Sequence, residues 1–261
     1  MRNKAIVVVS FGSSYEEARK KNIEPLENLI QENFKDYKVV RAFTSNIILR
    51  KLKRSNIHID TPKEALSKLI NDGYEEIIVQ PSHIIPGYEY EKIKQVVDKI
   101  NNETDANITL GRPLIYYNHD YELVIDALKS YIPKDIGEDE KILLMGHGTE
   151  HYANACYYYL QHLLKEKELP IIIGTVEEGI DVVVGRLKKE NCNKVALMPF
   201  MLVAGDHAQN DMAGDDEDSW KNTLLANNID VRIFIQGLGE NEAVRKIYLS
   251  HIEDVINNNE K

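Results

Sequence analysis

Short apolar runs alternate with longer amphipathic segments along the whole chain, and this alternation is the feature that most constrains the fold. Several runs, such as Ala5–Val9, are apolar on successive residues, which is typical of strands covered by helices on both faces of a sheet. Strands that alternate with helices predict an α/β protein with parallel sheets and right-handed crossovers. The predicted strands are Ala5–Val9, Lys38–Ala42, Glu76–Gln80, Ile108–Leu110, Lys141–Met145, Pro170–Thr175, Lys194–Pro199 and Asp230–Ile235. The predicted helices are Tyr15–Asn33, Thr61–Asn71, Tyr88–Asn101, Asp120–Tyr131, Tyr152–Lys167, Gly179–Glu190, Ser219–Asn227 and Glu240–Asn257.

A weak internal repeat divides the chain into two halves. Each half opens with a strand that runs into a glycine-containing turn, and later in each half a strand ends in proline with a glycine at the same distance beyond it. Because the intervening insertions differ, the pattern predicts a duplicated domain and not a solenoid. The repeat pairs Phe11 with His147, Ser45 with Glu177, and Glu89 with His207.

The boundary between the two halves is predicted in the segment Pro133–Glu140, which is acidic and contains proline and glycine. We therefore expect an N-terminal α/β domain over residues 1–135 and a C-terminal α/β domain over residues 136–261. Most candidate metal ligands lie in the second of these domains.

Three side chains of the second half follow strands of one predicted sheet: His147, Glu177 and His207. In parallel sheets ligands bind beyond the carboxyl ends of the strands. Two imidazoles and a carboxylate form a common ligand set for first-row divalent metals. The sequence therefore predicts a metal site at these three residues, with Glu89 reaching in from the first half as a fourth ligand or as a proton acceptor.

Other histidines and the acidic segment 206–218 carry weaker signals. His151 follows His147 by four residues and could join the cluster, but Gly148 stands where HExxH metallopeptidases have glutamate. We interpret His83 as structural, because it precedes an apolar turn. The segment 206–218 contains six acidic residues and no Lys or Arg, and we expect a solvated loop that could act as a lid or feed metal to the site.

The turn Ser10–Ser14 could present backbone N–H groups and hydroxyls to an anionic ligand at a helix N-terminus. It lacks the lysine of a P-loop and the three glycines of a dinucleotide fingerprint, which disfavours nucleotide binding. The formal net charge of −10 argues against nucleic-acid binding. No apolar stretch is long enough to span a membrane, no export signal is apparent, and the two cysteines fit neither a disulfide framework nor a CxxC site, so we expect a cytoplasmic protein.

Several segments together resemble the anaerobic sirohydrochlorin cobaltochelatases of the CbiK type, within the class II tetrapyrrole chelatases. The resemblance covers nearly the whole chain, and its most specific part is the run from Leu202 to Trp220. The segments that carry it are Val9–Tyr15, Arg41–Ser45, His83–Glu91, Met145–His151, Gly174–Glu178 and Leu202–Trp220.

The resemblance implies two flavodoxin-like domains and the insertion of Co²⁺ into sirohydrochlorin during anaerobic cobalamin synthesis, with cobalt as a substrate and no organic cofactor. It implies that His147 and His207 are the catalytic and metal-binding histidines, that Glu177 binds metal, and that Glu89 is an acidic residue of the cleft, which we assign as catalytic together with His147. Our hypothesis is that His147 leads the removal of the two pyrrole protons while His207 and Glu177 deliver the ion. The substrate carries eight carboxylates, for which the candidate contacts are Ser10, Phe11, Gly12, Ser13, Arg41 and Arg19.

Residue types alone leave alternatives open. A His/His/Glu set also suits nickel or iron, so a chelatase for another metal is one alternative. A tetrapyrrole or metal carrier without catalytic activity is another. The oligomeric state is not determined by the sequence, and a homo-oligomer is compatible with it.

Overall fold

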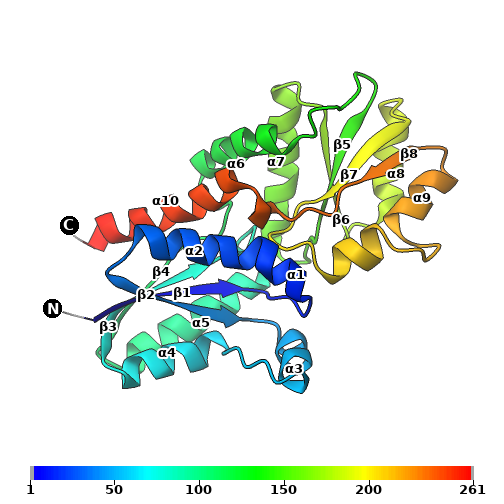
Figure 1. The fold of residues 1–261 in the computed structure, drawn as a ribbon. Helices are drawn as coiled ribbons and strands as arrows, with labels where there is room; N and C mark the ends of the chain where they lie inside the picture. The colour runs from blue at the N-terminus through cyan, green and yellow to red at the C-terminus, as the bar shows by residue number, and fades with distance from the viewer. Residues whose placement is uncertain (1–2, 260–261) are drawn as a thin grey trace.

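The computed structural model describes residues 3–259, which form two four-stranded parallel sheets with helices packed on their faces (Figure 1). The first half contains β1 (Asn3–Ser10), α1 (Glu16–Ala18), the π-helical turn η1 (Arg19–Ile23), α2 (Glu24–Asn33), β2 (Tyr37–Phe43), α3 (Asn46–Arg54), α4 (Pro62–Asn71), β3 (Tyr74–Pro81), α5 (Tyr88–Glu103), β4 (Asn107–Leu110) and α6 (Asn118–Tyr131). The second half contains β5 (Lys141–Gly146), η2 (Tyr152–Asn154), α7 (Ala155–Glu166), β6 (Ile171–Thr175), α8 (Ile180–Lys189), β7 (Lys194–Pro199), η3 (Ala208–Met212), α9 (Trp220–Ala226), β8 (Asp230–Ile233), η4 (Leu238–Glu240) and α10 (Glu242–Asn259).

The two sheets have the same strand order. The first runs β2-β1-β3-β4 and the second β6-β5-β7-β8, and every pairing is parallel. The central strands are buried along nearly their whole length because helices cover both faces, which explains their continuous apolar runs. The predicted α/β fold with parallel sheets is confirmed, and each of the eight predicted strands corresponds to an observed one.

Matching backbone hydrogen bonds establish the internal repeat atom by atom. In the first half the N–H of Ser45 donates to the carbonyl of Phe11 at 3.2 Å, and in the second half the N–H of Glu177 donates to the carbonyl of His147 at 3.1 Å. These bonds continue the register of the sheets beyond the strand ends. The structure therefore confirms that Phe11 corresponds to His147 and Ser45 to Glu177.

The same correspondence holds at the second pair of strand ends. Gly87 and Gly205 each donate their N–H to the carbonyl two residues earlier, at 2.9 Å in both halves. Glu89 and His207 stand two residues beyond these glycines, so they occupy corresponding positions after β3 and β7. The repeat thus places one carboxylate and one imidazole at related sites of the two halves.

The last helix of each half packs against the other half. On α6 the Tyr131 hydroxyl donates to the Gln236 carbonyl near β8, and α10 runs back beside α2 (Figure 1). On α10 the Tyr248 hydroxyl donates to the carbonyl of Ser82 after β3 at 2.9 Å. These contacts of α6 and α10 hold the two halves together. The boundary between the two domains at residue 135 stays a prediction.

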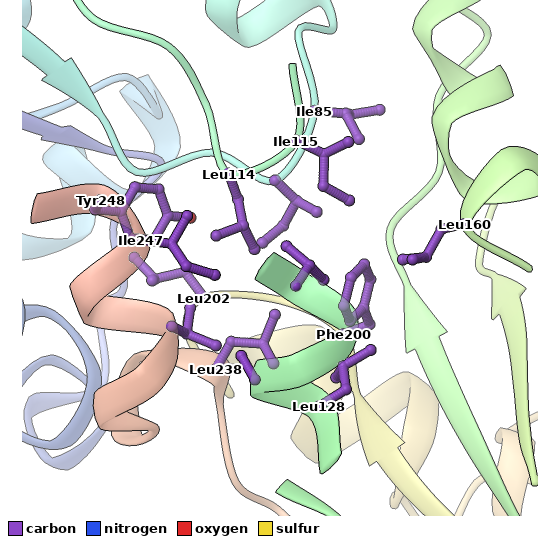
Figure 2. Close-up of a cluster of buried hydrophobic side chains, with 14 of the residues drawn as sticks. Ile85, Leu114, Ile115, Leu128, Leu160, Phe200, Leu202, Leu238, Ile247 and Tyr248 are labelled. Carbon is purple, nitrogen blue, oxygen red and sulfur yellow. The ribbon is translucent and has the colours of Figure 1, made fainter. Parts of the chain in front are cut away.

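One large apolar cluster lies between the two sheets. Figure 2 shows side chains from both halves converging in it, and burial of each such side chain stabilises the fold by about 1.5–3 kcal/mol. A shared core of this kind fixes how the two sheets face each other, and hence how the turns after their strands are placed. Its labelled members are Ile85, Leu114, Ile115, Leu128, Leu160, Phe200, Leu202, Leu238, Ile247 and Tyr248.

Two helical elements lie wholly outside the predicted helices. Helix α3 begins immediately after the N-cap Ser45, whose hydroxyl accepts from the N–H of Ile48 at 3.4 Å, and its β-branched isoleucines are more typical of strands. The acidic segment 206–218 was expected to be a loop, but it opens with the π-helical turn η3, because its buried Ala208 and Met212 pack into the second-half core. Among residues 3–259, no helix is both long and apolar enough to cross a bilayer.

Candidate active site

The imidazole rings of His147 and His207 are neighbours, with centroids 4.8 Å apart and planes inclined at 83°. His147 lies in the turn after β5 and is exposed, whereas the side chain of His207, just before η3, is about one-third exposed (37%). The strands β5 and β7 are adjacent in the sheet, so the turns that follow them meet at its carboxyl edge. The structure thus brings the two predicted histidines together.

Each of these rings is held through its Nδ1 atom. His147 Nδ1 lies 2.8 Å from the Gly148 carbonyl oxygen, and His207 Nδ1 lies 2.5 Å from Asp211 Oδ2. Since a carbonyl or an ionised carboxylate only accepts hydrogen bonds, Nδ1 carries the proton in both neutral rings. The Nε2 lone pairs are then available to bind a metal ion or to accept a proton, the arrangement common around metal-binding histidines.

The turn after β5 requires glycine at position 148. Gly148 has φ +77°, and a Cβ atom there would lie 2.7 Å from Glu177 Cβ and 2.8 Å from Thr175 Cβ. This contact packs the His147 turn directly on the segment that carries Glu177. The Glu177 side chain is exposed, and its N–H is bound to the His147 carbonyl.

A preassembled three-ligand site is not present among the described residues, where no group of three His, Cys, Asp or Glu side chains is placed to hold a metal ion. The structure brings His147 and His207 together and Glu177 to the adjoining turn, but the three do not form a closed set. The ligand set His147, Glu177 and His207 stays a prediction.

Glu89 lies in the first turn of α5. Its Oε1 accepts a hydrogen bond of 2.5 Å from Lys92, whereas its Oε2 is buried and has no hydrogen-bond partner among the described residues. Burial raises the pKa of Glu89, but the hydrogen bond and charge of Lys92, with the nearby Thr44 and His83, bring the pKa below its usual value. The carboxylate is therefore ionised at neutral pH and able to accept a proton.

The predicted substrate-binding turn after β1 is tightly packed. Gly12 has φ +99°, and a Cβ atom there would lie 2.5 Å from the Phe43 ring, so only glycine fits. The neighbouring Phe11 is 45% exposed, which leaves an aromatic surface at the position that corresponds to His147. Ser10 and Ser13 are buried.

Arg19 holds this turn from inside and is itself buried. Its guanidinium donates to the carbonyls of Ser13 and Ser14, at 2.9 Å in each case. The turn also reaches the other half, because the Tyr15 hydroxyl donates to Asp206, the residue before His207, at 3.0 Å. The prediction that Arg19 contacts substrate has no support in these bonds, which give it a structural role.

Arg41 lies on the edge strand β2 and is engaged in an ion pair with α2. Its guanidinium binds Glu27 on α2 through two hydrogen bonds of 2.5 and 2.8 Å, and Glu24 lies 3.7 Å away. The hollow that Arg41 lines between α2, β2 and residues 57–60 is not lined by His147, Glu89, Glu177 or His207. Its charge is thus already matched, and its predicted role in substrate binding stays untested.

His151 does not join the histidine pair. Its Nδ1 accepts from the N–H of Ala153 at 3.1 Å and caps η2, so its Nε2 carries the proton and faces Glu91 of α5 at 3.3 Å. The Tyr88 ring packs against it at 4.9 Å between centroids. His151 is only four residues from His147 in the sequence, but its ring bonds to Ala153 and to Glu91 of the other half and not to the histidine pair.

Sequence reasoning missed two partners of the site residues. Asp211 holds His207, and Lys92 holds Glu89. Both were detectable as spacings of one helical turn, namely four residues after His207 and three after Glu89. The first was hidden because the segment was expected to be a loop.

Comparison with known proteins adds independent information. The model of a family described as cobalt chelatase (CbiK) matches residues 4–257. The chain is 42% identical over 257 residues to the sirohydrochlorin cobaltochelatase of Salmonella typhimurium, with 97% of each protein covered. It is 32% identical over 255 residues to a sirohydrochlorin cobaltochelatase, CbiKC, of Nitratidesulfovibrio vulgaris, covering 97% of this chain and 90% of that protein.

Solved structures show the same fold at low sequence identity. SirB from Bacillus subtilis with Fe³⁺ aligns with a TM-score of 0.63 at 18% identity, covering 100% of this chain and 98% of that one. CbiX, described as the terminal enzyme of siroheme biosynthesis in denitrifying bacteria, aligns with a TM-score of 0.52 at 10% identity, covering 96% and 99%. These likenesses concern the architecture of two related halves.

Proposed function

The chain belongs to the CbiK family of cobalt chelatases, and from this premise we propose that it is an enzyme that inserts Co²⁺ into sirohydrochlorin in anaerobic cobalamin synthesis. The structural observation that best supports the proposal is the pair of histidines, His147 and His207, with rings 4.8 Å apart and both Nδ1 atoms anchored. A carrier would need ligands, whereas an enzyme for this reaction needs ligands and proton acceptors side by side.

The reaction exchanges two protons for one divalent ion. Two pyrrole N–H bonds of the macrocycle break, the metal forms bonds to the ring nitrogens, and two protons leave. In our proposal His147 accepts a pyrrole proton at Nε2 while His207 and Glu177 deliver the ion, and Glu89 assists as a second acceptor on the opposite half. One imidazole nitrogen cannot hold a proton and a metal ion at once, so the two histidines divide the work.

Contacts to the macrocycle belong to the turn after β1. The exposed ring of Phe11 offers an apolar surface to a flat substrate, and in our proposal the turn of residues 10–13 contacts its carboxylates. Arg41 would contribute only if its ion pair with Glu27 opened. No organic cofactor is required, because metal insertion changes no oxidation state, and we place the reaction in the cytoplasm.

The test is anaerobic incubation of the protein with sirohydrochlorin and Co²⁺, Ni²⁺ or Fe²⁺ in parallel, followed by the absorbance change on metal insertion. We expect the insertion of cobalt to be faster than the uncatalysed reaction at the same metal concentration. Preference for nickel or iron would replace cobalt in the proposal, since histidine and carboxylate ligands suit all three ions. No acceleration with any metal would favour a carrier.

A further inference from the structure

His83 is a buried histidine whose ring has no hydrogen-bond partner. It follows β3 directly, and its backbone carbonyl accepts from the N–H of Leu114 at 2.8 Å and from the Tyr248 hydroxyl at 3.2 Å. Both ring nitrogens are inaccessible to solvent and bind no other described group. A buried polar group left unpaired destabilises a fold by about 1–3 kcal/mol, so an arrangement of this kind calls for a functional explanation.

The inner carboxylate oxygen of Glu89, Oε2, is likewise buried without a hydrogen-bond partner among the described residues. Glu89 Oε1 is held by Lys92, whereas Oε2 and the Thr44 hydroxyl are both buried without a partner at full hydrogen-bond geometry, although a weak bond from Thr44 helps to lower the pKa of Glu89. The charge of Glu89 acts on the His83 ring, although burial outweighs it and lowers the pKa of His83 to about 4. His83 is therefore a neutral imidazole at neutral pH, close to an ionised carboxylate.

The polar residues Thr44 and His83 have no polar counterparts in the described part of the second half. The N–H of Leu114 binds the His83 carbonyl as the N–H of Leu238 binds the Met201 carbonyl, at 2.8 and 2.9 Å, which makes His83 and Met201 counterparts. Four polar residues that follow strands of the first half thus correspond to apolar residues or glycine in the second half. Ser10, Thr44, Ser82 and His83 correspond to Gly146, Val176, Phe200 and Met201.

We infer that His83 is a positioning residue, which hydrogen-bonds the inner oxygen of Glu89 whether that carboxyl is ionised or protonated. A neutral imidazole carries one donor and one acceptor. Its N–H can donate to the ionised carboxylate, and its other nitrogen can accept from the carboxylic acid that forms when Glu89 takes a pyrrole proton. His83 keeps its own proton throughout, and the proton on Glu89 leaves to solvent afterwards.

This inference rests on the proposed function, and substitutions at His83 test it through a split between kcat and KM. We expect His83→Leu, which removes both hydrogen-bonding atoms, to lower kcat for cobalt insertion by about tenfold, the loss of about one hydrogen bond to a charged group. KM for sirohydrochlorin and the dependence on Co²⁺ should stay within about twofold. His83→Gln, whose amide also has a donor and an acceptor, should restore kcat to within about threefold of the wild type.

Two comparisons separate positioning from a structural role. His162→Leu, at an exposed histidine of α7, is the matched control and should keep wild-type kcat. Because a hydrogen bond to Glu89 also stabilises the fold, His83→Leu should lower the thermal midpoint and His83→Gln should restore it together with kcat. In Glu89→Gln the additional His83→Leu change should cause little further loss, since both residues act on one step.

Three results would overturn the inference: an unchanged kcat in His83→Leu, a His83→Gln variant as slow as His83→Leu, or independent losses in the double variant. A crystal structure gives a readout that needs no activity, and we expect a His83 ring nitrogen within about 3.2 Å of Glu89 Oε2. An apolar side chain between them would contradict the pairing. If the wild-type protein inserts no metal, the proposed function fails, and this distance still decides whether the pairing exists.

Discussion

The imidazoles of His147 and His207 lie edge to face, 4.8 Å apart, because the strands that precede them are neighbours in one parallel sheet. Each ring is oriented by an acceptor at Nδ1, the Gly148 carbonyl in one case and the Asp211 carboxylate in the other. The partner of His207 is an acidic side chain, whereas the partner of His147 is the backbone carbonyl of the next residue. The two rings are thus not equivalent, and their substitution should have different consequences.

We expect His147→Ala to lower kcat for cobalt insertion by about 10²–10⁴-fold, the usual contribution of a positioned general base. The loss should persist at saturating Co²⁺ and sirohydrochlorin, because the proton acceptor itself is missing. Anaerobic absorbance kinetics measure it, with the exposed His162→Ala as a control. Near-normal turnover would remove His147 from its assigned role.

His207→Ala should instead raise the Co²⁺ concentration needed for half-maximal rate. A residue that delivers the ion contributes to metal capture, so excess metal should recover a substantial part of the rate. Titration of the initial rate with Co²⁺ at fixed sirohydrochlorin distinguishes the two histidines. If excess metal recovers His147→Ala but not His207→Ala, the assigned roles must be exchanged.

The pH at which kcat falls on the acid side should depend on Lys92. Glu89 acts as an ionised carboxylate, and its lowered pKa keeps it ionised as the pH falls, with activity lost only when the pH passes below that pKa. Lys92→Met removes the opposing hydrogen bond and charge and leaves the effect of burial, so the pKa of Glu89 rises. The acid limb of the kcat profile should move to higher pH, whereas Lys94→Met on the same helix should leave it in place. An unshifted limb would show that Glu89 does not set it.

Asp120 should stabilise the packing of α6 against α10, the last helices of the two halves. Burial raises its pKa, but hydrogen bonds from His251 on α10 and from the N–H of Tyr117, together with Arg112, lower the pKa to about 2. A lowered carboxyl pKa stabilises the fold above the ordinary value of about 3.9, and this contribution disappears as the pH falls towards 2.

Asp120→Asn should therefore lower the free energy of unfolding at pH 7 by about 2–3 kcal/mol, as measured by urea denaturation. The difference from the wild type should shrink as the pH is lowered from about 5 towards 2. The control is Asp126→Asn, an exposed aspartate of α6 paired with Lys129, for which we expect less than about 1 kcal/mol. A pH-independent difference would point to packing as the cause.

Gly148→Ala should reduce both stability and activity. The added Cβ meets Glu177 and Thr175 below 3.0 Å at a positive φ, so we expect a loss of about 1–3 kcal/mol and displacement of the His147 turn. Gly185→Ala is a matched control within α8, where nothing lies within 4 Å of the new Cβ, and it should stabilise the protein by about 0.5–1 kcal/mol. Thermal unfolding with cobalt-insertion rates checks both. A neutral Gly148→Ala variant would show that the turn relaxes freely.

The sequence by itself determined the order of strands and helices along the chain, the duplication of the domain and which residues follow the strands. Continuous apolar runs define strands covered on both faces, and the repeated turns make Phe11 and His147 counterparts, as the matching backbone bonds confirm. The carboxyl ends of parallel strands share one edge, so His147 and His207 could be placed together from local patterns alone. These inferences hold because each depends only on short segments and on the rules of parallel sheets.

Only the tertiary structure decided what each side chain binds. Arg41 is paired with Glu27, His151 is committed to Glu91, and the His83 ring lies unpaired beside Glu89. His151 and Glu91 come from different halves, which the core between the sheets holds together, whereas Arg41 and Glu27 lie on neighbouring elements of one half. The physical reason is that backbone periodicity is local, whereas burial and pairing of a polar group are set by whatever packs against it.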